Sequence, residues 1–206
     1  MNGPRTALVA GGGLAGLAAA CRLAKAGVRV TLVEKRPFLG GRAYSYEDRG
    51  TGAEVDNGQH VFLGCCTEYI RFLKELGAYH RVHMQKRMRV RVIDKVWGES
   101  LLRSGDLPPP LHLLPSLLRF RSLSPREKTL AIGALAVVRA VGPEQRREMD
   151  GITFGEWLRE HRQSENAVRS LWDLIVRPTL NDDASRVSAD LALMVFQDGF
   201  LRSRAA

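Results

Sequence analysis

The pattern of apolar and polar positions near the amino terminus predicts a strand, a helix and a second strand. Thr6–Ala10 is short and apolar, as a buried strand is, and residues 14–26 form a helical run rich in Ala and Leu. Residues 28–33 alternate as a strand does and lead into Glu34. Gly27 lies where a helix commonly ends in the left-handed conformation. The order of these elements predicts an α/β fold that begins with a parallel strand pair.

The turn between the first strand and the helix has the spacing Gly11-x-Gly13-x-x-Gly16. In such a motif the first glycine allows a tight turn, the second lets the backbone approach a diphosphate, and the third lets the helix pack closely on the strand. Leu14 and Ala15 begin the helix, where backbone N–H groups without intrahelical partners carry a partial positive charge. This arrangement is typical of a Rossmann-type dinucleotide site.

The acid at the end of the second strand narrows the choice of dinucleotide. Glu34 lies 21 residues beyond Gly13 (34 − 13 = 21) and is placed to accept hydrogen bonds from a ribose diol. Its negative charge disfavours the additional phosphate of NADP. Lys35, the next residue, is included with Glu34 among the predicted cofactor-binding residues.

Beyond residue 80 the pattern predicts one strand and then helices. Residues 81–91 hold five basic side chains and no acid, and the alternation over residues 88–92 predicts a strand with one charged face. Residues 107–120 contain three consecutive prolines and predict an extended stretch that becomes a short helix after Pro115.

Signatures of helix starts mark three later helices. Each begins at a Ser or Thr whose hydroxyl can accept a hydrogen bond from the first turn. The expected helices are one from Ser124-x-x-Glu127 to about Val141 and ended by Gly142-Pro143, one from Thr153-x-x-Glu156 that carries Trp157 and Leu158, and one over residues 189–201 capped by Ser188. Two interpretations of these amphipathic helices stay open: they form a core, or they rest with the basic segment on anionic lipid.

We divide the chain into two parts on this basis. Residues 1–80 are expected to form a Rossmann-type dinucleotide-binding segment, and residues 81–206 a mostly helical region, which the family resemblance described below implies to be a partial substrate-binding region. The three strand-like stretches up to residue 63 are expected to form one open sheet with unpaired edges.

Composition and charge exclude several classes of protein. Among the 206 residues 45% are hydrophobic and 26% charged, which fits a folded chain with a core rather than a disordered or collagenous one. The net charge of +9 suggests nucleic acid or an anionic membrane as partner. Because no nucleic-acid recognition motif accompanies the charge, no nucleic-acid partner is predicted.

The cysteines, the histidine pair and the apolar amino-terminal run give no evidence for a particular function. Three cysteines, including the adjacent Cys65 and Cys66, do not make a disulfide framework and are expected to be reduced thiols in a cytosolic protein. His80-x-x-His83 has no Cys or acidic partner at metal-ligand spacing, so no metal site is predicted. Three consecutive glycines interrupt the apolar amino-terminal run, which disfavours a signal peptide, and no stretch approaches the ~18 apolar residues of a membrane span.

The residues after Glu34 resemble the extended signature of the flavoprotein family that contains amine oxidases and phytoene desaturases. Gly40, Gly41 and Arg42 match the paired glycines and arginine that continue the flavin site in that family. Two glycines allow close backbone approach, and the arginine can hold a diphosphate or the flavin edge by bidentate hydrogen bonds. The resemblance implies an FAD cofactor in preference to NAD.

A second segment is similar to the squalene-associated FAD-dependent desaturases, a group that includes the hydroxysqualene dehydroxylases. It runs from Asp56 through Asn57, Gly58, Gln59 and His60, and residues 177–181 and 188–190 resemble the substrate region of that group. Asn57 and Gln59 can donate hydrogen bonds to the flavin ring, and Gly58 lets the backbone come close. His60, with an ordinary pKa near 6.5, is a candidate proton donor. A polar loop with turn-forming residues is the alternative interpretation of this segment.

The resemblance implies redox chemistry on a long hydrophobic isoprenoid, with reductive dehydroxylation of hydroxysqualene to squalene as the preferred reaction. Desaturation of a phytoene-type carotenoid precursor is the alternative within the enzyme class. Prenyl-synthase enzymes of the same pathway are expected as further partners, and the expected location is the cytoplasm, with peripheral contact to an anionic membrane as an open interpretation. Because family members are about twice as long, we expect the chain to be the amino-terminal half of a longer enzyme or a truncated gene product. A non-catalytic remnant that binds a membrane or a partner and no longer holds flavin is the alternative outside the enzyme class.

Overall fold

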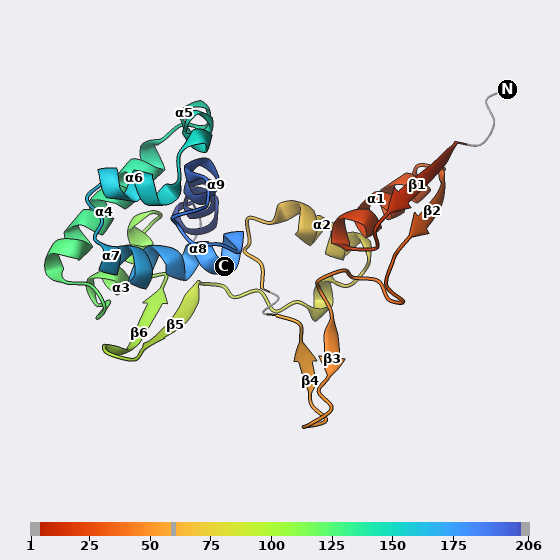
Figure 1. The fold of residues 1–206 in the computed structure, drawn as a ribbon, viewed down its shortest axis with the longest axis horizontal. Coiled ribbons are helices and arrows are strands. Elements are labelled where there is room, and N and C mark those ends of the chain that lie inside the picture. Colours follow the sequence, from red (N-terminus) through yellow and green to blue (C-terminus); the bar gives the residue numbers. More distant parts are fainter. Residues whose placement is uncertain (1–4, 59–60, 203–206) are drawn as a thin grey trace. The chain divides into compact units, whose positions relative to one another are not determined.

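A computed structural model describes residues 5–58 and 61–202 of the chain, which form two compact units that divide between Phe62 and Leu63 (Figure 1). The first unit contains a strand pair, one helix and a short hairpin. The second contains most of the helices and a longer hairpin. From the sequence we placed the end of the dinucleotide-binding segment after residue 80, and this boundary stays a prediction.

The first unit opens with the predicted strand, helix and strand. These are β1 (Thr6–Ala10), α1 (Leu14–Lys25) and β2 (Arg29–Val33). The strands β1 and β2 are parallel, with Thr6 opposite Arg29 and Ala10 opposite Val33. Gly27 has a φ of 79°, so it reverses the chain after α1 as expected. The parallel pair brings the carboxyl ends of both strands to the same edge, where the glycine turn lies.

The expectation of one open sheet up to residue 63 is wrong. The strands β3 (Ser45–Glu47) and β4 (Glu54–Asp56) pair with each other in an antiparallel hairpin, separate from β1 and β2. The side chain of Asp48 accepts hydrogen bonds from the N–H and the hydroxyl of Thr51 at 2.9 and 2.7 Å and so shapes the connecting loop. Because the loop is short, pairing within the hairpin is favoured locally over joining the parallel sheet.

The second unit contains one two-stranded antiparallel sheet among helices (Figure 1). The sheet pairs β5 (Arg89–Asp94) with β6 (Gly98–Arg103). The unit's helical elements are of three kinds: those labelled α are α-helices, η1, η2 and η3 are 3₁₀ turns, and η4 and η5 are π-helical. The helical elements are α2 (Thr67–Glu75), η1 (Tyr79–Arg81), η2 (Leu111–Leu113), α3 (Leu114–Leu118), α4 (Pro125–Ala140), α5 (Pro143–Glu148), η3 (Met149–Gly151), α6 (Phe154–Glu160), α7 (Glu165–Ala167), η4 (Val168–Trp172), α8 (Asp173–Leu180), α9 (Ala189–Met194) and η5 (Val195–Leu201).

Aromatic side chains form the centre of the second unit. Trp172 is fully buried, and the rings of Phe154 and Phe196 lie edge-on to it with centroids 5.7 and 5.0 Å away. The indole N–H of Trp172 donates to Gln163 Oε1 at 3.0 Å, so the ring is held in one orientation. The apolar sides of α4 and α6 are buried as well, which favours the core interpretation of these two helices over the lipid-facing one.

Two of the three predicted helix starts are confirmed in detail. Ser124 and Glu127 form a capping box at the start of α4, and Thr153 and Glu156 form one at the start of α6. Gly142 ends the region of α4 as expected, and it also precedes a further helix, α5, that the sequence analysis did not predict. Pro143 is tolerated as the first residue of that helix because its missing N–H would have had no helical partner.

The third predicted helix start is wrong, because Ser188 does not cap the helix. Ser188 precedes α9, but its hydroxyl makes no cap and instead donates to Asp150 Oδ1 at 2.6 Å. The expected single helix over residues 189–201 is α-helical only to Met194 and π-helical from Val195 to Leu201. The strand predicted over residues 88–92 is present as β5, whereas its partner β6 was not predicted.

The carboxylate of Glu127 joins the starts of α4 and α7. It accepts hydrogen bonds from the N–H of Ser124 at 2.7 Å, from the hydroxyl of Ser164 at 2.5 Å and from the amide of Asn166 at 3.1 Å. These bonds, with that from Ser164 the most important, lower the pKa of Glu127 to about 2. A carboxyl group with a pKa lowered on folding stabilises the fold at pH values above its unfolded pKa.

We predict that Glu127→Gln lowers the free energy of unfolding by about 1 kcal/mol at neutral pH, less than the full pKa shift would give, because water screens this partly exposed carboxylate. The difference from the unsubstituted chain stays constant above pH 4.5 and shrinks as the pH falls toward about 2, because protonation removes the same bonds. Urea denaturation at several pH values measures this effect. Glu160→Gln, on the exposed end of α6, is the matched control and leaves the pH dependence unchanged.

Candidate dinucleotide-binding site and apolar pocket

The glycine turn closes tightly between β1 and α1. Gly11 has a φ of 100°, which favours glycine, and its N–H donates to the carbonyl of Val33 on the neighbouring strand at 2.8 Å. A Cβ atom on Gly16 would lie 1.9 Å from the carbonyl oxygen of Gly11. The turn and the first turn of the helix therefore pack together only if both positions are glycine.

At Gly13 neither the backbone conformation nor a steric clash requires glycine. Its φ is −74°, and a Cβ atom there would meet the Cα of Gly41 at 3.9 Å, an ordinary contact. Gly13 precedes α1, and in the described residues no side chain caps this helix and no acid lies in its first turn. The first N–H groups of the helix, that of Ala15 among them, are thus left for a ligand, and the bare Gly13 lets a diphosphate come close.

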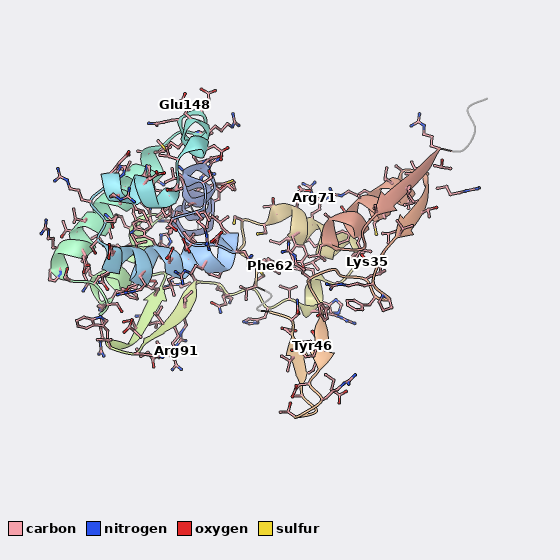
Figure 2. The ribbon with its side chains drawn as sticks, in the orientation of Figure 1. Lys35, Tyr46, Phe62, Arg71, Arg91 and Glu148 are labelled. Carbon is pink, nitrogen blue, oxygen red and sulfur yellow. The ribbon has the colours of Figure 1, made fainter. Side chains whose placement is uncertain are left out.

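Glu34 is held against the glycine turn. Its Oε2 accepts from the N–H of Gly12 at 2.6 Å, and its Oε1 accepts from the N–H of Arg36 at 2.9 Å. These hydrogen bonds, Arg36 first and Gly12 second, lower the pKa of Glu34 and keep it anionic at neutral pH. An ionised carboxylate has about four acceptor positions, so Glu34 can also accept from a ribose hydroxyl. Lys35, labelled in Figure 2, is exposed directly after β2 and its neighbour Glu34.

The second glycine pair lies beside the first motif. The N–H of Gly40 donates to the carbonyl of Gly12 at 2.8 Å, and Gly13 and Gly40 form a parallel bridge. Gly41 has a φ of 65°, and a Cβ atom on it would lie 3.0 Å from the Cα of Gly13. The chain thus brings together glycines that are about 28 residues apart in sequence. The side chain of Arg42 is exposed next to them.

The polar segment at the end of β4 contacts the same region. The backbone N–H of Asn57 donates to the carbonyl of Tyr44 at 3.0 Å, and its amide Nδ2 donates to the carbonyl of Arg42 at 3.2 Å. One amide proton of Asn57 therefore holds the loop, and one is left for a ligand. A Cβ on Gly58 would meet nothing within 4 Å. Gln59 and His60 lie outside the described residues.

These residues fit an FAD dinucleotide. An uncapped helix start faces the position of a diphosphate, and an ionised acid lies at the end of the second strand, where the ribose is expected. Each predicted residue within the described ranges is in the first unit, and the glycines and Glu34 are in direct contact through backbone groups. The part that each one has in binding FAD stays a prediction.

The second unit contains an apolar pocket of about 40 Å³. Ten of the side chains around it are apolar, and the other is Ser116, whose hydroxyl lies 3.0 Å from the carbonyl oxygens of both Arg103 and Leu113. The one other polar group, the indole N–H of Trp172, is bonded to Gln163. The pocket is therefore suited to a hydrocarbon group rather than to a polar one.

Both π-helical segments contribute to this pocket, and the sequence analysis did not find it. Leu171 and Trp172 come from η4, and Phe196 and Phe200 from η5. π-Helical turns in proteins frequently occur at functional sites. Their apolar residues resemble those of ordinary helices, so the sequence held no signal that would separate them.

Two further observations concern metal binding and membrane spans. Within residues 5–58 and 61–202, no group of three or more His, Cys, Asp or Glu side chains is arranged to hold a metal ion. In the same residues no helix combines the length and the apolar character needed to cross a membrane.

The chain belongs to the flavin-containing amine oxidoreductase family, whose model matches residues 14–198. The match confirms the resemblance inferred from the glycine motifs and supports FAD as the cofactor.

Particular relatives agree with this assignment. The chain is 31% identical over 204 residues to the zeta-carotene desaturase of Zea mays, covering 95% of this chain and 36% of that enzyme. It is 44% identical over 103 residues to the hydroxysqualene dehydroxylase of Zymomonas mobilis, covering 48% of this chain and 25% of that enzyme. The chain thus spans about a third of the length of the first of these relatives.

Solved structures confirm the predicted fold class, an α/β Rossmann-type FAD-binding domain with an interposed, largely helical region. A putrescine oxidase matches with a TM-score of 0.65 and 21% identity, over 98% of this chain and 46% of that one. The cyclohexylamine oxidase of Brevibacterium oxydans matches with a TM-score of 0.57 and 26% identity, over 94% of this chain and 42% of that one.

We predict that Gly13→Ala weakens FAD binding by at least about tenfold, because the added methyl group occupies the place of closest approach to the diphosphate. The fold tolerates the change, since the new atom makes only an ordinary contact. Titration of FAD, followed by the quenching of its fluorescence, measures the affinity, and circular dichroism checks the fold.

Gly133→Ala on α4 is the matched control, because a Cβ atom there meets nothing within 4 Å and so makes no clash either. It is expected to bind FAD as the unsubstituted chain does. Equal affinity in the two variants would show that Gly13 does not face the cofactor.

Proposed function

We propose that the protein performs flavin-dependent redox chemistry on a long isoprenoid, and that the reaction is the reductive dehydroxylation of hydroxysqualene to squalene. The observation that carries the proposal is the 44% identity over 103 residues to the hydroxysqualene dehydroxylase of Zymomonas mobilis. This identity is higher than the 28–31% found over longer spans with the zeta-carotene desaturases.

The apolar pocket of the second unit supports a hydrocarbon substrate. Its volume of about 40 Å³ compares with the roughly 10–15 Å³ that one water needs on the same measure, so it holds about three non-hydrogen atoms. A terminal isopropylidene group of an isoprenoid has this size. The absence of unpaired polar groups among the side chains described around the pocket means that such a group loses no hydrogen bond on entering.

The chain's own residues have distinct tasks in this proposal. The α1 amino terminus, with Gly13 in front of it, holds the diphosphate, and Glu34 holds the ribose. Bound FAD, once reduced, supplies the hydride for the carbon that loses its hydroxyl. His60 donates a proton to that hydroxyl, which then leaves as water. Arg42 and Asn57, which lie together, orient the cofactor.

A second candidate is desaturation of a carotenoid precursor, in which the substrate loses hydrogen instead of gaining it. It is favoured by the zeta-carotene desaturases, which match 94–98% of this chain. The same site serves either reaction, because FAD accepts and delivers hydride and both substrates are long isoprenoids. We propose a cytoplasmic enzyme that works beside prenyl-synthase enzymes.

We predict that the protein, purified at the length its gene encodes and supplied with reduced FAD, converts hydroxysqualene to squalene. Gas chromatography with mass spectrometry measures the product. His60→Gln is expected to lower the rate by about 10²-fold or more with little change in FAD affinity, because general acid catalysis contributes on that order.

Phytoene and zeta-carotene with oxidised FAD are the comparison substrates in the same assay. Formation of a desaturated carotene without squalene would replace the first reaction by the second. If FAD binds but neither product forms, the non-catalytic interpretation replaces both.

A further inference from the structure

The hairpin of β5 and β6 places two arginines directly opposite one another. Arg89 and Arg103 are partners in its antiparallel register, and we call them the opposed pair. Arg91, labelled in Figure 2, lies two residues further along on the same face. Like charges opposite each other on neighbouring strands destabilise the pairing. An anion bound between the two guanidinium groups would remove this repulsion.

Carboxylates neutralise the arginines on either side of the opposed pair. Arg91 Nε lies 2.8 Å from Glu99 Oε1, and Arg87 Nη1 lies 2.6 Å from Asp106 Oδ1. In the part of the chain that the structure describes, neither member of the opposed pair forms an ion pair with a carboxylate. The positive charge on this face is thus concentrated at one position of the hairpin.

A pocket of about 290 Å³ lies at this position. Its walls include Arg87, Asp106, Ser104 and the opposed pair. Three arginines and one aspartate give the walls a formal charge of +2 (3 − 1 = 2). The volume is close to the lower end of small-molecule sites, about 300 Å³, so it accommodates an anionic group together with part of the molecule that bears it.

We propose that this pocket binds a phosphate group, with Arg89 and Arg103 holding its oxygens from opposite strands. A guanidinium group offers parallel N–H donors that match two phosphate oxygens. A phosphate dianion balances the +2 charge of the walls, and the phosphodiester of a lipid, with one negative charge, balances half of it. Met88 lines both this pocket and the apolar pocket, but binding of phosphate here does not depend on the proposed redox chemistry.

The phosphate can belong to a soluble ligand or to a membrane lipid. At the tip of the same hairpin Ile93, Val96 and Trp97 are 75%, 80% and 52% exposed. Asp94 Oδ1 accepts hydrogen bonds from the N–H groups of Val96 and Trp97 at 2.7 and 2.9 Å, which fixes the shape of this tip. Exposed apolar and aromatic residues next to basic ones are typical of proteins that contact a lipid interface.

The test titrates the purified 206-residue chain with two probes, inorganic phosphate and vesicles of phosphatidylglycerol, with phosphatidylcholine vesicles for comparison. Arg89→Gln and Arg103→Gln are each expected to weaken binding by about tenfold, and Arg103→Lys by less, since it keeps the charge and loses the two-point geometry. Arg139→Gln, an exposed position on α4 with the same loss of charge, is the control and leaves binding unchanged.

Thermal unfolding provides a second readout that a merely structural role would not give. Without ligand, Arg103→Gln is expected to keep or raise the unfolding temperature, because it removes the repulsion within the opposed pair. Added phosphate is expected to raise that temperature for the unsubstituted chain and not for the variant.

The outcomes distinguish a membrane lipid from a soluble ligand, and they also test the proposal itself. A preference for phosphatidylglycerol vesicles that Trp97→Ser abolishes identifies a lipid, and equal or better binding of inorganic phosphate identifies a soluble ligand. Binding of neither probe, or equal weakening by Arg103→Gln and Arg139→Gln, overturns the proposal.

Discussion

The geometry of the candidate dinucleotide site depends on the carboxylate of Glu34. It accepts hydrogen bonds from the backbone N–H groups of Gly12 and Arg36, which belong to the glycine turn and to the segment after β2. Gly12 is buried, so its N–H would otherwise be left without an acceptor at a considerable cost in free energy. The acid that is expected to bind the ribose is therefore also a structural part of the turn that is expected to bind the diphosphate.

The strand, glycine turn, helix and second strand of the first unit could be predicted from the sequence because their determinants are local. Glycines with fixed spacing, a helix between two apolar strands and an acid at a set distance define a unit that leaves few alternatives. Even there the relation of β3 and β4 to the sheet was predicted wrongly. Their pairing is set by a loop in which the Asp48 side chain binds Thr51, a contact that hydrophobic periodicity does not reveal.

In the second unit, contacts between side chains that are far apart in the sequence limited what could be predicted about the fold. Ser188 has the sequence signature of a cap, yet its hydroxyl bonds to Asp150, 38 residues away. Strand β6 was missed because adjacent leucines, Leu101 and Leu102, interrupt the alternation that marks a strand. The apolar pocket combines residues from Met88 to Phe200, so only the folded chain shows that they meet.

The π-helical form of η5 has a consequence for how this pocket changes between related proteins. A π-helical turn contains one residue more than the corresponding α-helical turn, and each residue of a helix rotates the next by about 100°. Deletion of a single residue between Val195 and Phe200 would restore an ordinary helix, keep the direction of Phe200, and remove from this segment the one residue that the wider turn adds. Insertions and deletions of one residue, more than substitutions, are thus the changes that would reshape the wall of this pocket.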